Sequence, residues 1–91
     1  MMSLKKREEI LKKASKAISG ERDKHYGSPE DNFAQIAVFW TNYLHRIITS
    51  TDVAMMMILL KISRAMNDAT HEDNWIDIAG YAACAGEIEN G

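Results

Sequence analysis

Apolar residues recur every three or four positions through four stretches of the chain, and polar, turn-forming residues separate these stretches. Such spacing is typical of amphipathic helices. We expect helices over residues 3–19, from 29 to about 45, from a cap at Ser50 or Thr51 to about 67, and after a cap at Thr70. The pattern therefore predicts an all-α fold, a four-helix protomer in a single domain spanning residues 1–91.

Short motifs indicate where these helices begin and end. Gly20 follows the first apolar stretch and is a typical C-terminal cap. Ser28, Pro29 and Asp31 together are typical of a helix start, with serine as N-cap and proline in the first turn. The inward-facing residues are expected to be Leu4, Leu11, Ala14 and Ile18 on the first helix and Phe33, Ile36, Ala37, Trp40 and Leu44 on the second.

The third stretch is apolar nearly all round from Val53 to Leu60, so we expect this helix to be central and the most buried. The fourth stretch holds Gly80 and Gly86 among several alanines. A glycine inside a helix costs about 1 kcal/mol relative to alanine, and close approach of another helix usually offsets that cost. This small-residue face predicts assembly into a dimer or a larger closed oligomer.

Four charged residues should meet on the last two helices. A short connection near residue 69 makes these helices antiparallel, which brings Lys61 level with Asp77, and Arg64 close to Asp73. One interpretation is an internal ion-pair network that sets the helix register. The other is that Asp73 and Asp77 hold Mg²⁺ while the two cations bind phosphate.

The polar segment GERDKHYGSPEDNF adds further cations and an aromatic ring. A planar guanidinium beside a lysine and an aromatic ring suits a ligand that carries both phosphate and a base. The candidate ligand-binding residues are Arg22, Lys24, His25, Tyr26, Lys61, Arg64 and Trp75.

Composition and charge exclude several classes of protein. The chain is 46% hydrophobic and 26% charged, as in folded globular proteins, and its net charge of −2 argues against a general DNA-binding protein. The longest apolar run is too short to span a bilayer, and the N-terminus lacks the apolar region of a signal peptide, so we expect a cytoplasmic protein without membrane contact. Cys84 is the only cysteine, and His25, His45 and His71 are scattered, so a zinc site is not expected.

The ordered motifs RDKHYGSPEDNF, LLKISR and DNWIDIAGYAA resemble a family of small phage and prophage proteins of unassigned function. More distantly, the chain is similar to the MazG-like all-α nucleoside triphosphate pyrophosphatases and to phage domains associated with nucleotide modification. That resemblance implies an oligomeric helical protein that binds nucleotide phosphates and Mg²⁺ through acids on adjacent helices.

The chain departs from the pyrophosphatase pattern at two places. Asp77 matches one acid, but Asn74 replaces another, and no carboxylate lies between Val53 and Arg64. Because a two-metal hydrolytic site needs several anionic ligands, turnover is not expected.

Three functions therefore stay open. The first is a phage protein in the host cytoplasm that binds a nucleotide-type small molecule without turnover, for example to sequester a nucleotide immune signal. The second is a Mg²⁺-dependent pyrophosphatase, and the third is a structural or interaction module without a ligand.

Overall fold

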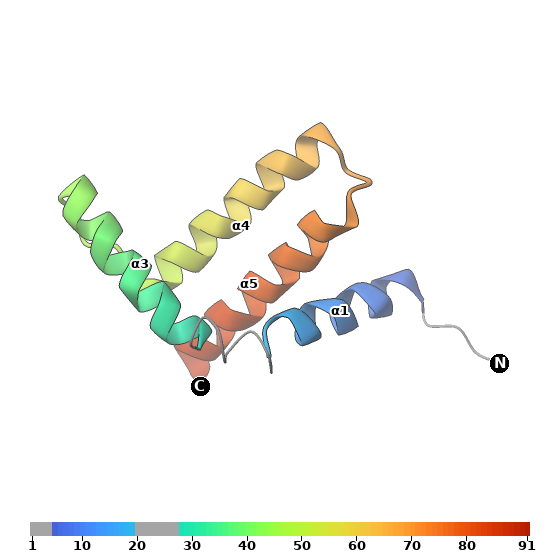
Figure 1. Ribbon diagram of the computed structural model, residues 1–91, viewed down its shortest axis with the longest axis horizontal. Coiled ribbons are helices and arrows are strands. Elements are labelled where there is room, and N and C mark those ends of the chain that lie inside the picture. Colours follow the sequence, from blue (N-terminus) through green and yellow to red (C-terminus); the bar gives the residue numbers. More distant parts are fainter. Residues whose placement is uncertain (1–4, 20–27) are drawn as a thin grey trace.

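The computed structural model describes residues 5–19 and 28–91, and the described residues form four helices without a strand (Figure 1). Their bounds are α1, Lys6–Ala17; α3, Pro29–Leu44; α4, Ser50–Asn67; and α5, Glu72–Asn90. The predicted all-α, four-helix fold is therefore confirmed. None of the described helices is long and apolar enough to cross a membrane.

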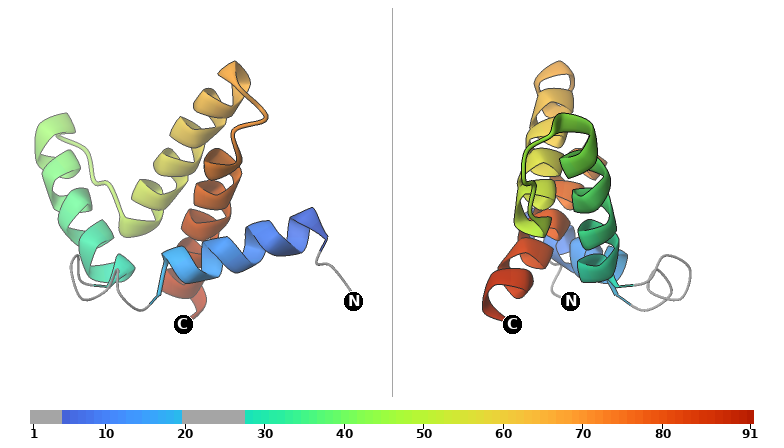
Figure 2. Two further views of the ribbon diagram at one scale, coloured as in Figure 1. Left: turned by 45° about the vertical axis from the view of Figure 1, so that its right-hand side comes forward. Right: turned by 90° about the vertical axis from the view of Figure 1, so that its left-hand side faces the viewer.

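The helices α4 and α5 form an antiparallel hairpin, as the short connection predicted (Figure 1). Two contacts hold the connection: the indole N–H of Trp75 donates to the carbonyl of Ala69 at 2.8 Å, and the Thr70 hydroxyl donates to Asp68 at 2.6 Å. The first helix, α1, packs against α5, whereas α3 contacts the beginning of α4 and diverges from it along its length (Figures 1 and 2).

Capping explains most of the helix boundaries. The Ser28 hydroxyl accepts the backbone N–H of Asp31 at 3.1 Å, which confirms the predicted start of α3. The start of α4 was predicted one or two residues late, because Thr49 is the N-cap and exchanges two hydrogen bonds with Asp52 in a capping box. The cap predicted at Thr70 is wrong: Thr70 is engaged with Asp68, and α5 begins after His71.

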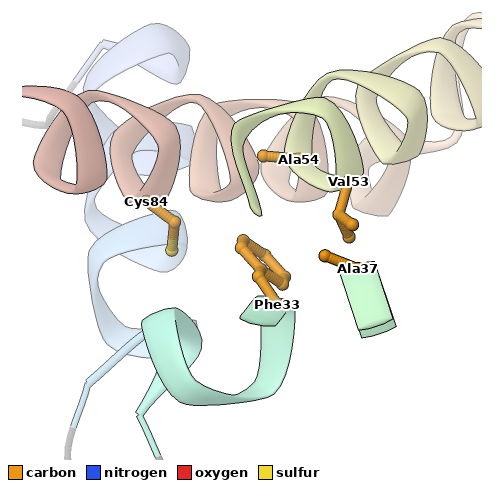
Figure 3. Close-up of a cluster of buried hydrophobic side chains, with 5 residues drawn as sticks. All are labelled: Phe33, Ala37, Val53, Ala54 and Cys84. Carbon is orange, nitrogen blue, oxygen red and sulfur yellow. The ribbon is translucent and has the colours of Figure 1, made fainter. Parts of the chain in front are cut away.

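The core lies where the first turns of α3 and α4 meet the second half of α5, and apart from Phe33 its buried residues are small. Figure 3 shows Phe33 and Ala37 of α3 facing Val53 and Ala54 of α4 and Cys84 of α5. The rings of Phe33 and Tyr81 lie 6.0 Å apart between centroids. Half-buried Ile36 and Trp40 extend this core as predicted.

Three predictions of burial are wrong. Leu11 on α1 and Leu44 on α3 are exposed because none of the four described helices covers them. The third concerns α4, which is buried only along the side that meets α5 and the base of α3. Its large apolar residues Met55, Met56, Leu59, Leu60, Ile62 and Met66 are 40–83% exposed.

The two glycines of α5 have different surroundings. A methyl group built at Gly80 would lie 3.2 Å from Cγ2 of Ile18, so the close approach predicted for this face is made by the end of α1 in the same chain. Around Gly86 nothing lies within 4 Å of such a methyl group. The small-residue face of α5 is thus partly occupied within the protomer.

Candidate functional site

A polar hollow of about 460 Å³ lies at the end of the α4–α5 hairpin. It collects residues from α4, from the connection and from the first half of α5. Its lining residues are Lys61, Arg64, Asn67, Asp68, His71, Asp73, Asn74 and Asp77. The hairpin therefore brings together the four charged residues that the sequence predicted.

Lys61 and Asp77 form the one ion pair of this hollow among the described residues. The ammonium of Lys61 lies 2.9 Å from Oδ2 of Asp77. The lysine side chain is only 15% exposed, whereas the aspartate is 37% exposed. Of the two predicted ion pairs, the one between Lys61 and Asp77 is thus present. Asp77 neutralises the charge of this largely buried lysine.

Arg64 has a different environment. No acid within residues 5–19 and 28–91 lies in ion-pair range of its guanidinium. It lines the same hollow as Asn74, whose side chain is 5% exposed and forms no hydrogen bond with another described residue. Five N–H donors and a buried amide are therefore available to a ligand in this hollow.

The acids of the hollow are not equivalent. Asp68 accepts hydrogen bonds from the hydroxyl and the backbone N–H of Thr70, which lower the pKa of its carboxyl group. Asp68 therefore serves mainly to shape the connection. Asp73 lies in the first turn of α5, where a carboxylate stabilises the helix N-terminus.

The described residues include no group of three or more His, Cys, Asp or Glu side chains that could hold a metal ion. The two predicted ligands, Asp73 and Asp77, do line one hollow. Two carboxylates are enough for Mg²⁺ only when water and ligand phosphates complete its coordination.

The sequence-predicted ligand residues separate into three groups. Lys61 and Arg64 meet in the hollow. Trp75 does not line it, because its indole is directed to the connection at Ala69. The remaining candidates, Arg22, Lys24, His25 and Tyr26, lie outside the described residues.

Sequence reasoning missed Asn67, His71 and Asn74 as lining residues. A signal was present, because Asn67 is three residues from Arg64 and Asn74 is three residues from Asp77. Residues three apart share a helix face, so each amide side chain could have been placed beside a charge that was already identified.

A second, smaller hollow of about 150 Å³ is lined by the end of α1, the start of α3 and α5, and is more apolar in its residues. Asp77 lines both. The other described residues around the second hollow are Ala17, Ile18, Pro29, Asn32, Phe33, Ile76, Gly80, Tyr81 and Cys84. Asp77 is thus the one described residue common to the two linings.

Comparison with known proteins places the chain in a family. Residues 9–89 match the family described as "Domain of unknown function (DUF6378)". The chain belongs to the DUF6378 family. No solved structure gives a significant match to it.

The DUF6378 chain has relatives among mycobacteriophage proteins. It is 46% identical over 81 residues to the Gene 55 protein of Mycobacterium phage D29. The matching region covers 89% of the chain and 54% of the relative. It is also 46% identical over 74 residues to the Gene 55 protein of Mycobacterium phage L5, covering 80% and 47%. The chain thus spans about half the length of these relatives, and the predicted resemblance to phage proteins is confirmed.

Proposed function

We propose that this DUF6378 chain binds a nucleotide or a nucleotide-derived anion in the hollow at the end of the α4–α5 hairpin, without turning it over. The observation that carries the proposal is Arg64, a cation that lines the hollow without an acid in ion-pair range among the described residues. A guanidinium binds phosphate in bidentate fashion, and such a bond is stronger than one between neutral groups.

The smaller hollow offers a place for a second, aromatic part of the ligand. Phe33 and Tyr81 contribute aromatic surface there, and Asn32 contributes an amide that can pair with polar edges of a base. A nucleotide combines an anionic end with a flat aromatic end, so two hollows of different polarity that share Asp77 favour it over inorganic phosphate.

The donor set favours binding over hydrolysis. The helix α4 carries no carboxylate between Val53 and Arg64, and the described residues hold no cluster of three metal-ligating side chains. A hydrolytic site that generates hydroxide needs more anionic ligands than Asp73 and Asp77 provide. A Mg²⁺-dependent pyrophosphatase of MazG-like type is the second candidate, because both of these acids line the hollow.

Isothermal titration calorimetry with a panel of nucleoside mono-, di- and triphosphates and cyclic dinucleotides, with and without Mg²⁺, tests the proposal. At least one member should bind, and Arg64→Gln should weaken that binding at least tenfold, as expected for loss of a charged bidentate contact worth about 1.5–3 kcal/mol. The matched control is Arg46→Gln, which removes an exposed arginine from the connection before α4, far along the chain from the hollow, and should leave the affinity unchanged.

Chromatography of the nucleotide after incubation separates the two candidates. Recovery of the intact nucleotide supports binding without turnover. Mg²⁺-dependent release of pyrophosphate that is lost in Asp77→Asn would support the pyrophosphatase instead, and binding of no panel member would remove both.

A further inference from the structure

The exposed face of α4 carries apolar residues at a regular spacing. Met55, Leu59, Ile62 and Met66 follow one another at intervals of four, three and four residues. Their side chains are 51%, 63%, 41% and 83% exposed, respectively. Alternating steps of four and three are the spacing of a two-helix seam, in which apolar side chains interlock along one stripe.

This stripe lies opposite the side by which α4 packs in its own chain. The inward side is formed by Val53, Ala54, Met57, Lys61 and Ala65, all buried or half-buried. At 100° per residue, the centre of the stripe lies about 140° around the helix from the centre of these positions. Nothing among the described residues covers it. Lys61 and Arg64 lie on another side of α4, whereas Asp52 continues the stripe three residues before Met55, where its carboxylate accepts the backbone N–H of Thr49 in the capping box.

The whole chain exposes more surface than a monomer of its size should. A compact 10.3 kDa protein is expected to expose about 5,400 Å². This chain exposes 6953 Å², and its radius of gyration of 14.5 Å exceeds the roughly 12 Å expected of a compact domain of its length. A stable dimer covers about 800 Å² on each partner, so pairing along α4 would lower the exposed area of each copy.

We propose that α4 pairs with α4 of a second copy in antiparallel orientation along this stripe, related by a two-fold axis. The stripe is self-complementary in that orientation: Met55 lies opposite the partner's Met66, and Leu59 lies opposite the partner's Ile62. Such reciprocity is what an isologous interface requires. This symmetry favours a second copy of the chain as the partner, because a stripe that binds an unrelated protein does not need to be self-complementary.

The sequence of α4 also argues against a lipid surface as the occupant. Interfacial helices carry lysine and arginine beside their apolar face. In α4 the two cations, Lys61 and Arg64, lie in the polar hollow on the side that faces α5. The proposal is independent of the proposed nucleotide function, since the stripe shares no residue with either hollow.

Light scattering coupled to size-exclusion chromatography tests the pairing with the full chain. The wild type should show a mass twice 10.3 kDa at micromolar concentration. Leu59→Glu with Ile62→Glu should halve that mass while the helical circular dichroism stays unchanged, because both positions are exposed in the protomer. The matched control is Leu11→Glu, at an exposed position of α1, and this variant should stay dimeric.

Cysteine cross-linking tests the orientation. A short bis-maleimide should link two copies in the double variant Met55→Cys with Met66→Cys, but not in Met55→Cys alone, since antiparallel pairing separates the two copies of position 55 by roughly 16 Å. Wild type with its buried Cys84 is the reagent control. The proposal would be overturned by a monomeric wild type or by a wild-type mass of three or more copies. It would also be overturned if the variant Leu59→Glu with Ile62→Glu stayed dimeric, or if Met55→Cys alone were linked efficiently.

Discussion

Lys61 shows how the position of one residue can be predicted from the sequence while its burial cannot. Folding the sequence about residue 69 placed it beside Asp77, and the two side chains meet at 2.9 Å. The pair is uneven, because the ammonium is largely buried whereas the carboxylate reaches solvent. Burial of this kind depends on which helices cover the site, and the sequence pattern of one helix does not contain that information.

The uneven burial leads to an asymmetric prediction for the two halves of the pair. Asp77→Asn leaves a mostly buried ammonium without a counter-charge and should lower the free energy of unfolding by about 1–3 kcal/mol. Lys61→Met keeps the apolar stem and leaves only a partly exposed carboxylate, so its cost should be below about 1 kcal/mol. Urea denaturation of both variants measures this difference, and equal losses would contradict it.

At the scale of helices, the ends of α3 were predicted well because capping is local. Ser28 and Pro29 determine the first turn without help from the rest of the chain. The start of α5 was predicted less well, since Thr70 has two possible hydrogen-bonding partners and the tight turn at Asp68 engages it. Competition between neighbouring turns is decided by geometry that a short motif does not specify.

The two glycines of α5 offer a matched pair of substitutions. Gly86→Ala places its methyl group in open space and should raise the free energy of unfolding by about 0.5–1 kcal/mol through better helix propensity. Gly80→Ala should gain less or lose stability, because its methyl group would press on Ile18 at the end of α1. Thermal melts of the two variants should therefore differ in this order, and a reversed order would argue against the packing of α1 on α5.

The attachment of α1 to α5 should also depend on pH. The Glu72 carboxylate accepts a hydrogen bond from Lys13 at 3.1 Å and lies 3.9 Å from Lys6, and these contacts lower its pKa below the usual 4.5. A lowered pKa contributes stability that is present above the unfolded-state pKa and is lost as the pH falls through the folded-state value. Melting temperatures of wild type and Glu72→Gln should thus differ at pH 6–7 and converge near pH 3, whereas a constant difference would exclude this linkage.

At the scale of the whole molecule, the small core is the main departure from expectation. The helix expected to be most buried, α4, leaves six large apolar side chains exposed. The reading of α4 as apolar nearly all round was sound, but such a helix needs cover on every side. Within the protomer, α5 and the base of α3 cover only one side, as Figures 1 and 2 show.

Pairing of two copies predicts that stability depends on protein concentration. If the folded protomer is completed by a second copy, mass action raises the melting temperature as the concentration increases. A hundredfold increase in protein concentration from 1 µM should raise the wild-type melting temperature by several degrees. This shift is on the order of that caused by 1–3 kcal/mol of added unfolding free energy in a domain of this size. The variant Leu59→Glu with Ile62→Glu should melt lower and independently of concentration, and a concentration-independent wild type would contradict the pairing.

The sequence by itself determined the four described helices, the cap at Ser28, the antiparallel hairpin and the meeting of Lys61, Arg64, Asp73 and Asp77. These features follow from interactions between residues that are close along the chain or related by one short turn. Only the tertiary structure decided which faces were covered: that Gly80 meets Ile18, that Trp75 is directed to Ala69, and that the outer face of α4 is left open. Coverage depends on how separate helices divide a limited apolar surface among themselves, and a periodic pattern identifies a face without identifying its neighbour.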